Sequence, residues 1–425
     1  MLFLTSHVLA QRSDLSGIKI CIDPGHGGNN PANDRHLIPD PGTDFWESES
    51  NFQKALLLKS LLEAKGASVI LTRNTNSYPI DADEPSLSAR VALANANNVH
   101  WFHSIHSNAA GFSPNTTVNR TLMLVREQIV AGGSPIYGPG TGQPEWQEAW
   151  DMSGLVGPKI QSMLRTQSWS RSTDLTFYSW ANPPFTLGVL RGLLMPGQLS
   201  EGSFHDFYPE TRRLMNNSYR KMEAYAIRDA FLQYFGVPAD TSCIVAGLLK
   251  NSSGTPINGV RVRLLPENIV YYGDNYNNGF YMLDGIAAGQ HTVRFETPGF
   301  RVDSVQVNVT AASTNFFDRI LELVAVPVEP TASLVPSTFE LRQNYPNPFN
   351  PTTKLSFVIG HSSLVSLKVF DVLGREVATP VNEWKEAGSH SIEFSSQKSE
   401  ISSGVYFYQL KAGEFLSVKK MILLK

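Results

Sequence analysis

The stretch Asp23-Pro24-Gly25-His26-Gly27-Gly28 decides how the first half of this chain is interpreted, because it places a histidine at a strand end. The apolar run before it, Ile18-Lys19-Ile20-Cys21-Ile22, has the pattern of a buried strand. The glycines beside His26 allow unusual backbone angles and leave space next to the imidazole ring. A single histidine is more often a hydrogen-bonded structural residue than a ligand, so the interpretation depends on further residues.

A carboxylate follows at the point where a loop enters an apolar segment. Glu47 precedes the segment from Phe52 to Leu62, which has helical spacing, and Lys65-Gly66 marks the predicted helix end. The helix dipole favours an acid in the first turn, so Glu47 could have that role alone. Glu49 is close enough to be a rival ligand.

A second histidine lies at the polar end of another strand pattern, from Trp101 to Asn108. Alternation along a strand places His106 on one face and His103 on the other, so an unbroken strand cannot point both at one ion. We expect His106 to be the ligand and His103 and His100 to be structural.

A second carboxylate, Glu201, ends the mostly apolar run that begins at Leu193. A carboxylate in such a place is costly to bury unless it is paired or functional. A structural ion pair is the alternative to a functional role here.

Two imidazoles and one carboxylate from three separate segments match the ligand count of a catalytic zinc site, which leaves a fourth position open for water. A closed structural site would usually add cysteines, and the chain has only Cys21 and Cys243. Zinc would acidify the water, and Glu201 would take its proton and return it to a leaving amine. The predicted chemistry is hydrolysis of an amide.

In order and spacing, these motifs resemble the zinc-dependent N-acetylmuramoyl-L-alanine amidases of bacterial cell-wall turnover. The resemblance runs from about Ile18 to Phe235 and includes further matching stretches: Leu71-Thr72-Arg73, Leu87-Ser88-Ala89-Arg90, Ala94-Asn95, Ser104-Ile105-His106-Ser107-Asn108, and Leu187-Gly188-Val189-Leu190-Arg191 followed by Met195-Pro196. It implies an α/β domain, residues 17–237, with a mixed central sheet flanked by helices.

The resemblance also implies the site. One zinc ion per chain would be bound by His26, Glu47 and His106, with Glu201 as the catalytic carboxylate, and the spacing from Glu47 to Asn51 favours Glu47 over Glu49. Such enzymes cut the amide bond between N-acetylmuramic acid and L-Ala in peptidoglycan. The segment after Glu201, Gly202-Ser203-Phe204-His205-Asp206, departs from the small or apolar run that is usual in the family.

The region between Asn108 and Leu187 is long and rich in aromatic residues. It contains a loop from Gly132 to Gly140 and a predicted helix from Glu145 to Arg165. It is either a packed insertion or a wall or lid of the substrate groove.

Beyond Pro238 short strands and turns predict two small all-β sandwich domains. Residues 240–325 resemble carboxypeptidase-regulatory-like domains, which implies a spacer or binding module. Prolines within residues 326–339 indicate a stiff linker. Residues 340–425, beginning with Asn344-Tyr345-Pro346-Asn347-Pro348, resemble the C-terminal sorting domain of type IX secretion substrates, an address read by the secretion machinery.

Composition fits a large secreted chain. At about 150 residues per domain, 425 residues suggest roughly three domains. A net charge of −3 argues against nucleic-acid binding and a polybasic membrane patch, and two distant cysteines predict no disulfide framework. No apolar run reaches the roughly 18 residues of a transmembrane segment.

Residues 1–16 are interpreted as a leader with the remnant of a signal peptide, because Val8-Leu9-Ala10 suits a cleavage site. The positive start of such a peptide is missing, so either the true start lies upstream or this is a frayed terminus. We expect a secreted or cell-surface protein that passes through the periplasm, with peptidoglycan and the secretion machinery as partners.

Two other functions stay open at this point. A zinc peptidase would apply the same metal chemistry to a peptide bond. A non-catalytic wall-binding surface protein would keep the fold without turnover, and the two β modules motivate it. The intact set of His26, Glu47, His106 and Glu201 counts against this last alternative.

Overall fold

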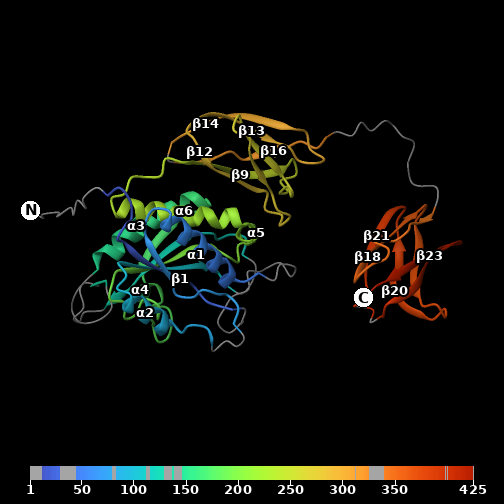
Figure 1. Ribbon diagram of the computed structural model, residues 1–425, viewed down its shortest axis with the longest axis horizontal. Helices are drawn as coiled ribbons and strands as arrows, with labels where there is room; N and C mark the ends of the chain where they lie inside the picture. Colours follow the sequence, from blue (N-terminus) through green and yellow to red (C-terminus); the bar gives the residue numbers. More distant parts are fainter. Residues whose placement is uncertain are drawn as a thin grey trace, which may run out of the picture. The chain divides into compact units, whose positions relative to one another are not determined.

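The computed structural model describes residues 12–28, 45–78, 83–111, 115–128, 136–137, 146–311, 313–324, 339–397, 399 and 401–424. The chain contacts divide it into two compact units, Met1–Val324 and Ala325–Lys425 (Figure 1). The predicted signal-peptide remnant and residues 326–338 of the predicted linker lie outside the described residues. So does the predicted loop at Gly132–Gly140, apart from the short strand β6 (Ile136–Tyr137), which pairs with β5 (Glu127–Gln128).

A six-stranded sheet forms the centre of the first unit. Its strand order is β2-β1-β3-β8-β4-β7. The strands are β1 (Lys19–Pro24), β2 (Ser68–Leu71), β3 (Trp101–Asn108), β4 (Thr121–Val125), β7 (Trp169–Thr173) and β8 (Gly197–Phe204). The first four strands in this order are parallel, β4 runs antiparallel to β8, and β7 is parallel to β4. The sheet is therefore mixed, and the predicted fold class is confirmed.

Helices cover both faces of this sheet (Figure 1). The three long helices lie on one face: α1 (Glu47–Glu63), α3 (Gln147–Leu164) and α6 (Asn217–Tyr234). They pack on the inward side chains Ile20, Ile22 and Ile105. On the other face α2 (Leu87–Ala96) packs against Cys21 and Phe102. The short helices are α4 (Asp174–Phe177) and α5 (Tyr208–Leu214). Strands β1, β3, β4 and β8 are therefore buried almost continuously, as expected for a sheet that is covered on both faces.

Two histidines of the central sheet have structural partners. Nδ1 of His100 accepts a hydrogen bond from the backbone N–H of Lys19 at 2.9 Å. His103 is fully buried on the face of the long helices, where Nδ1 lies 3.1 Å from Nε2 of Gln198 and Nε2 lies 3.1 Å from Oγ of Ser200. Burial lowers the pKa of His103 to about 3, so this imidazole is neutral and fully hydrogen-bonded.

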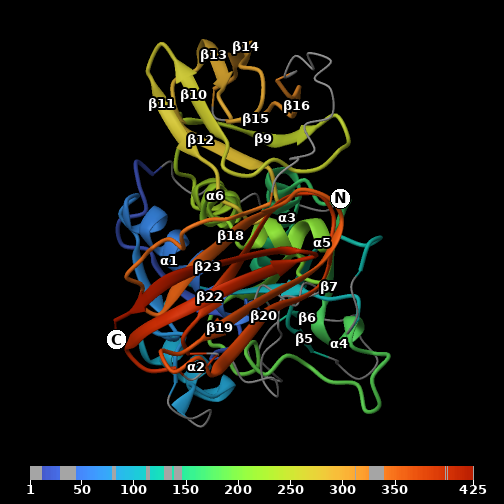
Figure 2. The same cartoon turned by 90° about the vertical axis from the view of Figure 1, so that its right-hand side faces the viewer.

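The second part of the first unit consists of two facing sheets, as expected for a β-sandwich. One has the order β11-β10-β13-β14 and the other β12-β9-β15, with β16 also paired to β9. The strands are β9 (Cys243–Asn251), β10 (Arg261–Leu265), β11 (Ile269–Tyr272), β12 (Phe280–Ile286), β13 (Gly289–Phe295), β14 (Asp303–Val309), β15 (Thr314–Phe316) and β16 (Arg319–Leu321). The sheet containing β9 and β12 lies toward α6 (Figure 2).

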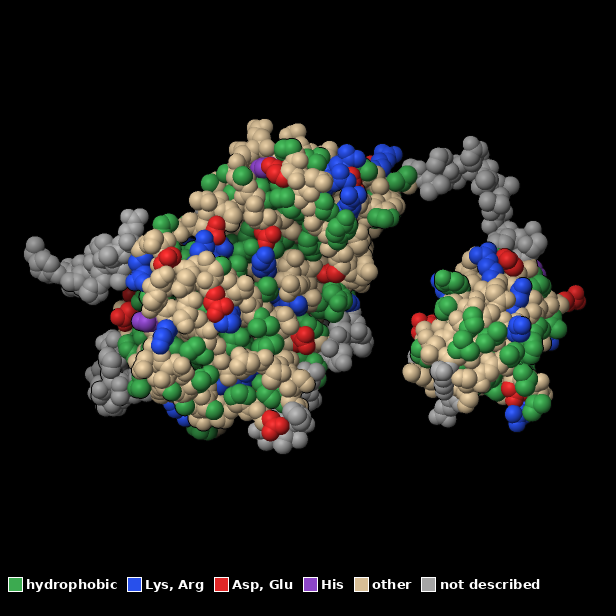
Figure 3. Space-filling view, viewed as in Figure 1, with side chains coloured by type: hydrophobic (Ala, Val, Ile, Leu, Met, Phe, Trp, Pro, Cys, Tyr) green, Lys and Arg blue, Asp and Glu red, His purple; other side chains and the backbone are tan. Residues whose placement is uncertain are grey.

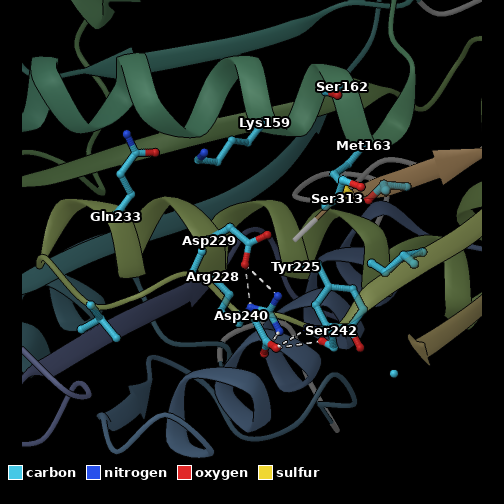
Figure 4. Close-up of a pocket in the computed structure, with 15 residues that line it drawn as sticks. Lys159, Ser162, Met163, Tyr225, Arg228, Asp229, Gln233, Asp240, Ser242 and Ser313 are labelled. Atoms are coloured by element: carbon cyan, nitrogen blue, oxygen red, sulfur yellow. Dashed lines mark hydrogen bonds and ion pairs between the residues drawn. The ribbon is translucent and has the colours of Figure 1, made fainter. Parts of the chain in front are cut away.

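Polar contacts fasten this sandwich to α6. Asp284 of β12 accepts a hydrogen bond from the Tyr225 hydroxyl at 2.8 Å and pairs with Lys221. Beside them is a cavity of about 470 Å³, where Arg228 pairs with Asp240 at 3.2 Å (Figure 4). Asp240 also pairs with Lys65, at 3.0 Å. These contacts join the α/β part and the sandwich into one unit, so the division between residues 237 and 240 stays a prediction.

The second unit is an antiparallel structure of two sheets, with orders β17-β18-β21 and β20-β19-β22-β23. The strands are β17 (Glu340–Leu341), β18 (Thr352–Ile359), β19 (Ser363–Phe370), β20 (Glu376–Lys385), β21 (Gly388–Ser395), β22 (Gly404–Ala412) and β23 (Phe415–Leu423). The buried Tyr408 hydroxyl donates to the Arg342 carbonyl at 2.8 Å and accepts from the Asn344 N–H at 2.7 Å. This ties the Asn344 stretch to the core.

The surface carries no dominant charge of one sign on the face shown in Figure 3, where acidic and basic side chains are interspersed over a mostly uncharged surface. This agrees with the net charge of −3. Among the described helices, none combines the length and the apolar character that crossing a membrane would need.

We predict that His103 makes the first unit less stable in acid. Its folded-state pKa of about 3 lies below the unfolded value of 6.5, so its contribution is complete above pH 6.5 and is lost as the pH falls toward 3. The slope from this one group is at most about 1.4 kcal/mol per pH unit.

Urea unfolding followed by tryptophan fluorescence at a series of pH values measures this effect. Between pH 6.5 and 3, the free energy of unfolding should depend less steeply on pH in the variant His103→Gln than in the wild type. The control His361→Gln, at an exposed histidine of the second unit, should keep the wild-type slope. Identical slopes for the wild type and His103→Gln would contradict the prediction.

Candidate metal centre

Three of the predicted site residues meet at the carboxyl ends of the parallel strands, the edge where open α/β sheets usually bind ligands. One donor atom each from His26, Glu47 and His106 lies within 4.8 Å of the others. Nε2 of His26 is 3.3 Å from Oε2 of Glu47, and Nδ1 of His106 is 3.4 Å from Oε1 of Glu47. Glu49, the rival from the sequence, is not part of this group.

The loop after β1 brings His26 to this point through two unusual backbone features. His26 itself has φ +57°, a left-handed conformation that is uncommon outside glycine and is often found at functional sites. Gly25 packs directly on the ring of His106, where a Cβ atom would lie closer than 3.0 Å to the ring atoms. The Gly25 N–H donates to the Ile105 carbonyl at 2.9 Å, which fastens the loop to β3.

Two buried arginines hold the same loop from outside. Arg90 of α2 donates to the carbonyls of Pro24 and His26, at 2.9 and 3.0 Å. Arg73, which follows β2, donates to the carbonyls of Pro24 and Gly25, at 3.0 and 3.2 Å. These contacts give a structural reason for the two arginine motifs of the sequence, because each arginine fixes the backbone that presents His26.

Asp23 completes this support beneath the loop. It accepts hydrogen bonds from Arg90 at 3.0 Å, from the Ser104 hydroxyl at 2.6 Å and from the Thr72 hydroxyl at 2.5 Å. Burial opposes its ionisation, but Arg90 and the two hydroxyls outweigh burial and hold the pKa of Asp23 below its usual value. Asp23 is therefore an anion that joins β1, β3 and α2.

Glu47 is the first residue of α1 and is almost completely buried. Oε1 accepts from the Ser107 N–H at 3.0 Å and from Nδ2 of Asn51, one helical turn later, at 3.2 Å. Burial opposes ionisation of this carboxyl, but the neighbouring imidazoles of His26 and His205 outweigh burial and hold its pKa well below the usual range. Glu47 is therefore an oriented carboxylate.

His106 presents the form of imidazole that binds a metal. Its burial lowers its pKa, although the hydrogen bond to Glu47 opposes this shift. A neutral imidazole has a ring nitrogen with a free lone pair, which is what a metal ligand requires.

Glu201 lies on the strand next to His106 but outside the three-residue group. The register pairs His106 directly with Glu201, so both side chains are on the α2 face of the sheet. Glu201 is 8% exposed. Directly after this pair the register shifts, because Gly202 and Ser203 together oppose Ser107. Such bulges are common next to active sites, where they re-aim side chains.

His205 is a site residue that the sequence analysis did not assign. It is buried, with Nδ1 at 3.6 Å from Oε2 of Glu47 and 2.9 Å from the Ser107 carbonyl oxygen. The signal was present in the sequence, since His205 belongs to the segment after Glu201 that departs from the family pattern. Its direction could not be predicted by assuming that side chains alternate between the two faces of the sheet, because the bulge at Gly202 and Ser203 interrupts this alternation.

A cavity of about 390 Å³ opens beside the two histidines. Its walls come from the start of α2, including Leu87, and from Leu187, Gly188 and Val189. Within the long region before Leu187, helix α3 is packed against the sheet, because it buries Met152, Val156 and Ile160 in the core. Of the described residues of this region, only Leu187, at its end, lines the cavity.

Fold and site together define the first part of the chain as a candidate metallohydrolase domain of the α/β class. The chain belongs to the N-acetylmuramoyl-L-alanine amidase family, whose model matches residues 20–233, half of the chain. Residues 343–424 match the secretion system C-terminal sorting domain, which indicates a secreted or cell-surface protein.

Individual relatives agree with the family. An uncharacterised cell wall amidase of Bacillus anthracis is 28% identical over 226 residues, which are 53% of this chain and 37% of that protein. The sporulation-specific N-acetylmuramoyl-L-alanine amidase of Bacillus subtilis is 35% identical over 96 residues, 22% of this chain and 32% of that protein. The chain thus spans about a third of the length of the curated relatives it matches.

Solved structures of similar domains include the catalytic domain of the amidase CwlV from Bacillus (Paenibacillus) polymyxa, with 18% identity and a TM-score of 0.38. That match covers 52% of this chain and 99% of the solved one. The amidase AmiC2 of Nostoc punctiforme has 22% identity and a TM-score of 0.37, with coverage of 52% and 98%.

We predict that Gly25→Ala weakens metal binding without unfolding the protein. The added methyl group overlaps the His106 ring, which must shift from the position in which it faces Glu47. We expect the affinity for zinc, measured by competition with a chromophoric chelator, to fall at least about ten-fold. Gly111→Ala is the matched control, since a Cβ there meets nothing within 4 Å. Equal affinities of both variants and the wild type would contradict this account of Gly25.

Proposed function

We propose that the protein hydrolyses the amide bond between N-acetylmuramic acid and L-Ala in peptidoglycan, with one zinc ion per chain held by His26, Glu47 and His106. The observation that carries this proposal is the convergence of the three donor atoms within 4.8 Å in a chain of the amidase family. Two imidazole nitrogens and one ionised carboxylate are a donor set that suits zinc, and three protein ligands are the number found in catalytic zinc sites.

Zinc bound in this way polarises a carbonyl group and acidifies water. The residues of the chain transfer the proton and hold the ligand carboxylate in place. Glu201, beside His106, takes a proton from the attacking water and returns it to the leaving amine of L-Ala. Glu47, Asn51 and the Ser107 N–H form a fixed set, so the ligand carboxylate does not reorient during turnover.

The cavity is lined by His26 and His106, so it gives the scissile amide access to the proposed zinc position. Its lining combines the apolar side chains of Leu87, Leu187 and Val189 with the charged groups of Asp23 and Arg90. Mixed lining of this kind, apolar with a few placed polar groups, is typical of small-molecule and peptide sites. The sorting domain then directs the enzyme to the type IX secretion machinery.

We predict that Glu201→Gln separates zinc binding from catalysis. The variant keeps the shape of the side chain and all three ligands but lacks the base, so zinc should stay at one ion per chain while turnover of purified sacculi falls by about 10²–10⁴. Glu49→Gln, on the first turn of α1 but outside the ligand group, is the control and should keep wild-type turnover. Wild-type activity in Glu201→Gln would show that another group is the base.

We also predict that metal removal and product analysis identify the reaction. Dialysis against a chelator should abolish release of material from sacculi, and zinc should restore it. Mass spectrometry should find free stem peptides that begin with L-Ala. Peptides shortened at internal bonds would indicate a zinc peptidase, and binding without any release would indicate a wall-binding protein.

A further inference from the structure

A stripe of buried polar side chains runs along α1 behind the metal centre. Glu47, Asn51 and Lys54 are four and three residues apart, so they lie on one face of the helix, and each is at most 1% exposed. Glu47 and Asn51 belong to the candidate metal centre. Lys54 has no part in the mechanism, although burying an ammonium group is costly.

The partner of Lys54 is a carboxylate on another helix. Nζ of Lys54 lies 2.8 Å from Oε2 of Glu223 in α6, and both side chains are 0% exposed. Burial raises the pKa of Glu223, the Lys54 ammonium opposes this shift, and the nearby Glu210 adds to it. Within the described part of the chain, the 2.8 Å contact to each other is the one polar contact found for Nζ of Lys54 and the carboxylate of Glu223.

Such a pair is a poor source of stability. A buried ion pair that leaves hydrogen-bonding capacity unused recovers little of its desolvation cost, and apolar residues of similar volume are often as stable or more stable in its place. A local arrangement that stability does not favour is a candidate for a positional role.

The surroundings of Glu223 indicate what the pair positions. The carboxylate lies directly under Gly202, where a Cβ atom would be closer than 3.0 Å to its atoms. Gly202 follows Glu201 and belongs to the bulge of β8. One end of the pair is therefore on the helix that carries Glu47, and the other end touches the strand segment that carries Glu201.

We propose that Lys54 and Glu223 form a positioning pair that sets α1, with the metal ligand Glu47, against the β8 bulge, with the base Glu201. Apolar side chains between two helices tolerate small sliding movements. A buried charge pair does not, because a displacement leaves each charge without its counterion. The role of Glu201 in this inference rests on the proposed amidase function, whereas the link to Glu47 depends on metal binding alone.

The double variant Lys54→Met/Glu223→Leu tests the proposal, because it removes the charges together and keeps the volume. We expect its thermal midpoint to equal or exceed that of the wild type, while its zinc affinity falls about ten-fold, as for other groups that orient a metal ligand. On sacculi, kcat should fall and KM should change little. The matched control is Lys59→Met/Glu63→Leu, which removes a partly exposed ion pair of the same helix.

The outcomes separate clearly. A stable double variant with the zinc affinity and kcat of the wild type would overturn the proposal. If the double variant does not fold, the single variant Glu223→Gln is used instead, because it keeps the shape of the side chain beneath Gly202. A loss of zinc affinity in this folded variant supports the positioning role. Unchanged zinc affinity and kcat overturn it. If the wild type has no amidase activity, the zinc measurements still test the pair, so the two failures are distinguishable.

Discussion

The site depends on one constraint, the burial of the Glu47 carboxylate between imidazole groups. An anion that is almost completely removed from water needs compensating partners. Here the N–H of Ser107 and the amide of Asn51 orient it, and His26, His106 and His205 surround its oxygens at 3.3 to 3.6 Å. Strand β1 and its loop, strand β3, the bulge of β8 and the start of α1 must all be in place for this arrangement to exist.

The supporting residues show how the fold meets this constraint. Arg73 and Arg90 bind backbone carbonyls on both sides of the loop that carries His26, and Asp23 binds Arg90 from below. None of the three is needed as a metal ligand. Their common effect is to hold a left-handed histidine in one conformation, which a free loop would rarely adopt.

Much of the fold and of the candidate site could be predicted from the sequence, because both depend on short motifs and on the pattern of apolar residues. Strand periodicity and the Asp-Pro-Gly-His stretch indicated the candidate ligands His26 and His106. The resemblance to the amidase family implied the α/β fold and favoured Glu47 over Glu49. Helix α1 begins at Glu47, five residues before the predicted apolar segment, because its first turn is polar yet buried. His205 could not be found in this way, because its position depends on the bulge of β8. The pair of Lys54 and Glu223 could not be found either, because these two residues are far apart in the sequence.

X-ray absorption spectroscopy at the zinc edge of the reconstituted protein would identify the atoms that bind the ion. We expect one zinc ion per chain, with two imidazole nitrogens at about 2.0–2.1 Å, carboxylate oxygen at about 2.0–2.2 Å and no sulfur ligand. Failure to bind zinc with the ligand residues intact, or a shell with fewer than two imidazoles, would contradict this expectation.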